Sequence, residues 1–205
     1  MPLMPDMSGH FSTPTWAGDH SLFFARAWAE RLTLQIDVAK AASDRLRNID
    51  WQIERMEEWS PSELDYETAF RALWTECVLT VWIADGLHRW LVALAKELGE
   101  EPPTPIPNLR KLRNALMHLD AATFDEEGPH ADPGGKGGQA RDLRALPGSR
   151  ILIRSWTPGS PLFDLLDVDQ LAVIARQLLD RLDDELDDMA EDYFVQQEID
   201  RRRGK

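Results

Sequence analysis

Residues 60–99 read SPSELDYETAFRALWTECVLTVWIADGLHRWLVALAKELG, and this stretch decides the fold class. Ser60 can cap a helix, Pro61 is tolerated at the first helical position, and Glu63 can complete a capping box. Gly99 supplies the stop. Apolar side chains recur between these signals at spacings of three and four residues, as on one face of an α-helix: Phe70, Leu73, Cys77, Val81, Ala84, Leu87, Leu91, Leu94 and Leu98. The pattern predicts one long helix that forms the spine of a bundle.

A row of tryptophans widens the apolar stripe of this helix: Trp74, Trp82 and Trp90. The whole chain holds eight tryptophans, enough large apolar surface for a packed core or a buried interface. Gly86 is a position at which the helix could bend.

Two more long helices are predicted, one before this helix in the sequence and one after it. Asp19 or Ser21 can cap a first helix that runs to about Arg55, with apolar residues at helical spacing. A capping pattern at 167–170 opens a final helix, whose apolar positions continue as far as Tyr193.

The region between the second and last long helices is more irregular. Residues 100–107 form a proline-rich connector, and Asn108 can cap a short helix after it. Residues 121–149 are rich in Gly, Pro and Asp and predict a long loop. Residues 151–156 (ILIRSW) form the only convincing strand, which can belong to a small hairpin. We therefore treat 121–157 as a loop and hairpin insertion.

The predicted fold class is an all-α, up-and-down helical bundle with a long Gly-rich loop and a small β-hairpin. We expect a single bundle domain over residues 19–200. An irregular arm of residues 1–18 precedes it, and a basic tail of residues 201–205 follows it.

The composition indicates a cytoplasmic protein. The chain is 43% hydrophobic and 29% charged, and its one cysteine, Cys77, excludes an internal disulfide and fits a reducing compartment. No secretory signal is evident at the start. The most apolar segment, 73–95, contains Glu76, Asp85 and Arg89 and is too polar for a lone membrane span. We expect no association with a membrane.

The net charge of −13 argues against indiscriminate nucleic-acid binding over the whole surface, but the charge is uneven. Residues 106–154 hold eight Lys/Arg and six Asp/Glu, a local charge of +2. Residues 164–200 hold two Arg and thirteen Asp/Glu, a local charge of −11. The last helix therefore carries most of the acidity, whereas the short helix lies in a locally basic segment.

The short helix, LRKLRNALMHLD at 109–120, contains the candidate site. Four leucines form its core-facing stripe, and His118 lies about 130° from the centre of that stripe on a helical wheel: Leu109, Leu112, Leu116 and Leu119. Asn114 lies one turn before His118, Arg110 continues that line, and Arg113 sits nearer the apolar border. This polar row is either a solvated surface or the wall of a cleft that faces a ligand or a second subunit.

Arg113-Asn114-Ala115-Leu116-Met117-His118 resembles the Arg-x(4–6)-His signature of the HEPN family, small all-α domains common in bacterial toxins and phage-defence systems. A polar residue often follows the arginine in that family, as Asn114 does here. The resemblance covers residues 20–120 and the terminal helix, and it leaves the Gly-rich loop and the strand unexplained.

The resemblance implies a homodimer in which two Arg–His motifs meet in a cleft, and a metal-independent endoribonuclease that needs no cofactor. His118 would act as acid or base, Arg113 would bind the scissile phosphate, and Asn114 would position one of them. Arg110 and Lys111 would contact the RNA backbone. A role in toxin–antitoxin pairs or phage defence, with an antitoxin or other defence protein as partner, also comes from the resemblance. We expect single-stranded RNA as substrate.

One position departs from the family pattern. Toxins of this family that pair with a nucleotidyltransferase antitoxin carry a tyrosine two residues after the histidine, and this chain has Asp120 there. Regulation through modification of that tyrosine is therefore not predicted.

Other chemistry-bearing patterns are weaker, and no metal site is predicted. Asp85-x-x-His88 resembles half of a carboxylate-bridged metal site but lacks a helical second half. His130-x-Asp132 is a pair in a loop, and the glycine run 134–138 does not match a phosphate-binding loop.

A hypothesis from a different class is a non-catalytic helical interaction module. In that case the acidic last helix would bind a basic protein partner. The two hypotheses differ in where they place His118: in a cleft shared by two subunits, or on open surface.

Overall fold

The computed structural model describes residues 13, 15–55, 59–131 and 141–202, and this part of the chain is predominantly helical. Its elements are, in order, α1 (Trp16–Glu54), α2 (Glu63–Leu98), α3 (Leu109–Met117), the 3₁₀ turn η1 (Leu119–Ala121), β1 (Thr123–Asp125), β2 (Gly128–His130), α4 (Arg141–Arg144), the 3₁₀ turn η2 (Pro147–Ser149) and α5 (Val168–Arg202). The prediction of an all-α fold with a small β-hairpin is confirmed.

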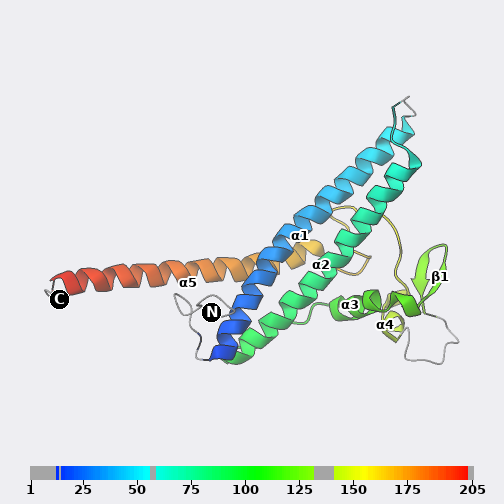
Figure 1. Cartoon of the computed structure of the whole chain (residues 1–205). Coiled ribbons are helices and arrows are strands. Elements are labelled where there is room, and N and C mark those ends of the chain that lie inside the picture. The colour runs from blue at the N-terminus through cyan, green and yellow to red at the C-terminus, as the bar shows by residue number, and fades with distance from the viewer. Residues whose placement is uncertain (1–12, 14, 56–58, 132–140, 203–205) are drawn as a thin grey trace, which may run out of the picture.

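Helices α1 and α2 run side by side as a long hairpin, which is the framework for everything else (Figure 1). Figure 1 shows α5 extending to one side of this hairpin and α3, α4 and β1 gathered on the other. The core lies between α1 and α2, with contributions from α3, the 151–166 segment and the first half of α5.

Gly86 does not interrupt α2, and it allows α1 to pack closely against this helix. A Cβ atom at this position would lie 3.0 Å from ring carbons of Trp28 on α1, closer than an ordinary carbon contact. Glycine therefore lets the Trp28 indole rest against the backbone of α2.

The predicted cap of α1 is wrong. The N-cap is Thr15, four residues before Asp19, and its Oγ1 accepts from the Gly18 N–H at 2.9 Å. Asp19 accepts instead from the Thr13 N–H at 2.7 Å, and Ser21 is buried within the helix. The error arises because Thr, Asp and Ser can all cap a helix, and only the path of the preceding chain selects one.

The predicted cap of α2 is wrong by two residues. Ser62 is the N-cap, and Asp65 completes a reciprocal capping box with it. The Ser62 hydroxyl and backbone N–H both donate to the Asp65 carboxylate, and these two hydrogen bonds lower the pKa of that carboxyl. Ser60 donates to the Gln52 carbonyl at 2.9 Å, which links the end of α1 to the start of α2. Gly99, in the left-handed region at φ 70°, ends α2 as predicted.

The start of α5 is confirmed. Asp167 Oδ1 accepts from the N–H groups of Asp169 and Gln170, at 2.9 and 3.0 Å. These two bonds satisfy donors that the first turn of a helix leaves without partners. The helix continues to Arg202, past residue 201, where the tail was expected.

The strand prediction for residues 151–156 is wrong, and so is the prediction of a continuous loop over 121–149. The hairpin is formed by β1 and β2, in which Thr123 pairs with His130. Ile151 and Ile153 each donate one backbone hydrogen bond toward β2, and the chain then turns away. Alternating apolar residues predict a strand, but a strand forms only where a partner edge continues. The glycine run 134–138 lies outside the described residues.

The 151–166 segment is anchored to the α1–α2 hairpin through Trp156. The buried Ser43 hydroxyl of α1 donates to the Trp156 carbonyl at 2.6 Å, and the Trp156 indole N–H donates to the Ser160 carbonyl at 2.9 Å. Phe163 packs edge-on against Trp74 of α2, with ring centroids 5.1 Å apart. Phe163 adopts a positive φ of 52°, a conformation that this packing stabilises.

Replacing Ser43 by alanine should lower the free energy of unfolding by about 1–2 kcal/mol, because the buried Trp156 carbonyl loses its donor. Urea unfolding followed by circular dichroism measures the change. Ser155→Ala, at an exposed serine of the same segment, is the matched control and should change stability by less than about 0.5 kcal/mol. Equal effects of the two variants would show that the Ser43 hydrogen bond contributes nothing.

Candidate functional site

The short helix α3 lies against α2 through its apolar stripe. Leu109, Leu112 and Leu116 are buried, as the spacing predicted, and Leu119 packs against the core from η1. Asn108 is at the N-cap position as expected, but in the left-handed region and with no side-chain capping bond. This packing fixes which α3 side chains face α2 and which face outward.

Arg113 faces α2, where it meets a buried carboxylate. Its Nε lies 3.6 Å from Oδ2 of Asp85, a residue only 4% exposed. The same oxygen lies 2.8 Å from an Nη2 of Arg89, one turn further along α2. Two guanidinium groups therefore share one buried carboxylate, which holds the Arg113 side chain beside α2.

Asn114 links Arg113 to α4. Its Oδ1 accepts from Nη1 of Arg113 at 3.1 Å, and its Nδ2 lies 3.5 Å from Oδ1 of Asp142. One network of polar contacts thus crosses α2, α3 and α4 and contains Asp85, Arg113, Asn114 and Asp142. Each side chain in this network restricts the rotamers of its neighbour.

Asp85, Arg113 and Asn114 line a groove of about 420 Å³ between α2 and α3, which we name the α2–α3 groove. Its lining residues are Asp85, His88, Arg89, Val92, Pro105, Ile106, Leu109, Arg110, Arg113 and Asn114. Three arginines face one carboxylate here, so the groove is cationic in a chain with a net charge of −13. A groove of this kind suits an anionic ligand such as a phosphodiester.

The predicted site residues divide into two groups. Arg110, Arg113 and Asn114 are brought together in the α2–α3 groove. His118 is exposed, at the end of α3, and does not line the groove, and Lys111 is likewise exposed and outside it. Within one chain, therefore, Arg113 and His118 do not share this groove.

Asp85 and Arg89 are functional candidates that the sequence analysis did not assign to this site. An acid in the most apolar part of a helix is a usable signal, because a buried carboxylate needs a cationic partner. Which cation it meets depends on how α3 packs, and this is not visible in the spacing. His88, next to them, also lines the groove.

The environment of His88 favours its neutral form. Burial lowers the pKa of its imidazole, and the nearby Asp85 carboxylate opposes this only in part. A neutral imidazole keeps both a donor and an acceptor for a ligand in the groove.

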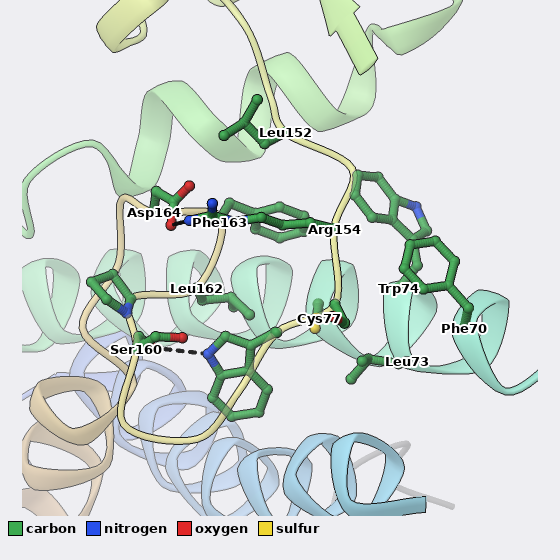
Figure 2. Close-up of a pocket in the computed structure, with 13 residues that line it drawn as sticks. Phe70, Leu73, Trp74, Cys77, Leu152, Arg154, Ser160, Leu162, Phe163 and Asp164 are labelled. Carbon is green, nitrogen blue, oxygen red and sulfur yellow. Dashed lines mark hydrogen bonds and ion pairs between the residues drawn. The ribbon is translucent and has the colours of Figure 1, made fainter. Parts of the chain in front are cut away.

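A second feature, between α2 and the 151–166 segment, is a packing void (Figure 2). Figure 2 shows Cys77, Leu73 and Leu162 around it. Its volume of about 20 Å³ has room for no more than a water molecule. Burial raises the pKa of the Cys77 thiol to about 12, with a smaller contribution from Glu76, so Cys77 is the inert, buried residue that its position predicted.

Metal binding finds no support among the described residues, which contain no group of three or more His, Cys, Asp or Glu side chains able to hold an ion. Asp85 is paired with arginines, and His130 lies at the end of β2 within 3.4 Å of Asp125. Asp132, the other half of the His130 pair, lies outside the described residues.

One helix in the described part of the chain, α2, is long and apolar enough to cross a membrane by length and composition. Half of its most apolar window is buried inside the folded chain, and a buried core helix meets the same criterion. The cytoplasmic location therefore stays a prediction.

No family model, no curated protein and no solved structure matches the chain. Any functional assignment therefore depends on the residues of this chain and their geometry.

Acidification should destabilise the protein through His88. Below the ordinary histidine pKa of about 6.5 the unfolded chain binds a proton that folded His88, with its lowered pKa, binds less readily. Stability should therefore fall between about pH 7.5 and about pH 5.5, and His88→Gln should lose less over this range. Urea midpoints at both pH values measure this. The exposed His20→Gln variant is the control, and an equal loss in wild type and His88→Gln would contradict the expectation.

Proposed function

We propose that the protein is a metal-independent endoribonuclease of HEPN type that acts on single-stranded RNA. The observation that supports this most is the placement of Arg113 and Asn114. Both side chains of the RNALMH motif line a cationic groove and are held there by Asp85 and Asp142. A solvated helix face would not need this network of buried and half-buried partners.

Electrostatics favours a phosphodiester as the group bound in the α2–α3 groove. Arg89 and Arg113 share Asp85, while Arg110 has no ion-pair partner among the described residues. An incoming phosphate therefore meets an arginine that no carboxylate of the described residues neutralises. The cationic surface of the groove is local, and the rest of the surface is acidic. Polyanions are therefore repelled elsewhere on the protein and bind selectively in the groove.

The chemistry assigned to His118 is proton transfer. The 2′-oxygen of the RNA attacks the adjacent phosphorus as its proton passes to an imidazole. The bond from phosphorus to the 5′-oxygen breaks as that oxygen takes a proton from a second imidazole. The products are a 2′,3′-cyclic phosphate and a 5′-hydroxyl end. Arg113 holds the non-bridging oxygens and stabilises the charge that develops on them.

In this proposal a second copy of the chain brings His118 next to Arg113, because one copy alone does not place both in the groove. His118 is exposed at the end of α3 and does not line the groove that contains Arg113 of the same chain. A two-fold axis near the end of α3 would bring two His118 imidazoles together and place them beside two grooves. The proposal therefore includes a homodimer. An antitoxin or another defence protein would be its regulator.

The nuclease proposal is tested by incubating purified protein with mixed single-stranded RNAs in EDTA. Wild type should cleave, and His118→Ala should lose about 100- to 10,000-fold in rate. Arg113→Ala should lose about 100- to 1,000-fold. RNA with a 2′-deoxy sugar at the cleavage site should resist, because the nucleophile is missing. Gel electrophoresis and end-group analysis measure the rates and products.

Matched controls separate chemistry from general damage. His20→Ala on α1 and Arg176→Ala on α5 replace exposed residues of the same types and should cleave at the wild-type rate. The nuclease proposal is wrong if wild type is as inert as His118→Ala, or if His118→Ala cleaves as fast as wild type. In that case an interaction module becomes the better description.

The dimer is tested separately from activity. Light scattering after size-exclusion chromatography should give a mass twice the 23.4 kDa of one chain. A cysteine introduced at exposed Met117, next to His118, should cross-link two copies under mild oxidation, because the proposed axis passes near the end of α3. A cysteine at Thr68 on α2 is the control that should not cross-link. A monomeric mass at concentrations where the protein cleaves RNA would contradict the composite site.

A further inference from the structure

A second cavity adjoins the α2–α3 groove and has no role in the proposed phosphate chemistry. We name it the α5 compartment; it has a volume of about 570 Å³. Its lining residues are His88, Leu91, Pro103, Thr104, Pro105, Ile106, Pro107, Gln170, Ile174, Gln177, Leu178 and Arg181. His88, Pro105 and Ile106 line both cavities, so the two are neighbours with a common wall.

The two cavities differ in charge. The α2–α3 groove has three arginines against one carboxylate. Among the described residues that line the α5 compartment, only Arg181 is charged, and it makes a two-pronged contact with Glu100, at 2.8 and 3.2 Å. The pairing with Arg181 lowers the pKa of the Glu100 carboxyl, which keeps Glu100 ionised and the pair neutral overall near pH 7. A ligand that spans both cavities would be anionic at one end and neutral at the other.

The walls of the α5 compartment suit a flat, neutral, polar-edged group. Proline rings and the side chains of Ile174 and Leu178 supply apolar surface. Gln170 and Gln177, two turns apart on α5, lie on one face of that helix and line the compartment, so their carboxamides are within reach of a ligand there. A carboxamide offers a donor beside an acceptor, the pattern that the edge of a nucleobase also presents. Unpaired bases of RNA are recognised through such edge contacts and through stacking.

We infer that the α5 compartment binds an unpaired nucleobase of the RNA strand whose phosphate occupies the α2–α3 groove, and that Gln170 and Gln177 select the base. This inference rests on the proposed function for the identity of the strand. The volume lies within the range of about 300–1,000 Å³ typical of sites for small organic ligands, which accommodates a base with its ribose. His88, on the shared wall, lies where the base and the phosphate meet.

The test uses strands that cannot be cleaved, so that it is independent of catalysis. Fluorescently labelled 2′-O-methyl octamers of A, C, G and U are titrated with the full chain, and anisotropy gives the four affinities. Wild type should bind one octamer at least about fivefold more tightly than another, the lower end of what an amide–base contact contributes. Gln170→Ala and Gln177→Ala should each remove most of this preference.

Controls separate base recognition from backbone binding. Gln52→Ala, at the far tip of the α1–α2 hairpin, should leave all four affinities unchanged. Arg110→Ala should weaken all four octamers to the same extent and make binding less dependent on salt. Gln177→Glu keeps the size of the side chain but removes its donor, so it should also alter the ranking of the octamers. Circular dichroism checks that each variant is folded.

Several results would overturn the inference. One is that Gln170→Ala, Gln177→Ala and Gln177→Glu all leave the four affinities within twofold of wild type while Arg110→Ala weakens them. A second is that no octamer binds. A third is that a free 5′-mononucleotide binds as tightly as the octamer of the same base, which would make the compartment a mononucleotide site. A base preference that depends on the glutamines, in a protein that cleaves no RNA, would support the compartment and remove the nuclease proposal.

Discussion

The apolar seam between α1 and α2 is the constraint on which the rest of the structure depends. Small residues of α1, such as Ala25 and Ala29, and the glycine at position 86 of α2 let the two helices approach closely. The seam also contains a fully buried amide, Gln35, which donates to the Glu76 carboxylate at 2.6 Å and accepts from Arg31 at 2.9 Å. Because these polar atoms are satisfied, the seam specifies one register of the two helices. The 151–166 segment and α5 then pack on this framework, as does α3.

Asp85 connects this framework to the candidate site. Burying a carboxylate costs free energy unless cationic groups and hydrogen bonds offset the cost. In this protein Arg89 on α2 and Arg113 on α3 both approach it. The position of Arg113 is therefore set by the packing of α2, and the Asn114–Asp142 contact adds a second restraint from α4. In the proposed nuclease, an arginine held in this way would lose little conformational entropy when a phosphate binds.

The helices could be predicted from the sequence because their signals are local. The leucines of α3 and the apolar stripe of α2 repeat at the helical period, and Asp167 stands directly before the last helix. The caps of α1 and α2 were less predictable, since several residues near each start can cap and the chain path chooses among them. The strand at 151–156 was misassigned because its apolar pattern is strand-like while its pairing partner ends after two hydrogen bonds.

The candidate site was predictable only in part, for a physical reason. The sequence by itself determined that α3 is amphipathic, that Arg113, Asn114 and His118 lie outside its core-facing leucines, and that the region is locally basic. Only the tertiary structure decided that Arg113 meets Asp85 and that Arg110, His88 and Asn114 share one groove. It also decided that a second cavity, lined by Gln170 and Gln177, adjoins this groove through His88, Pro105 and Ile106. Periodicity is a property of neighbouring residues, whereas the pairing of charges on separate helices depends on how those helices pack.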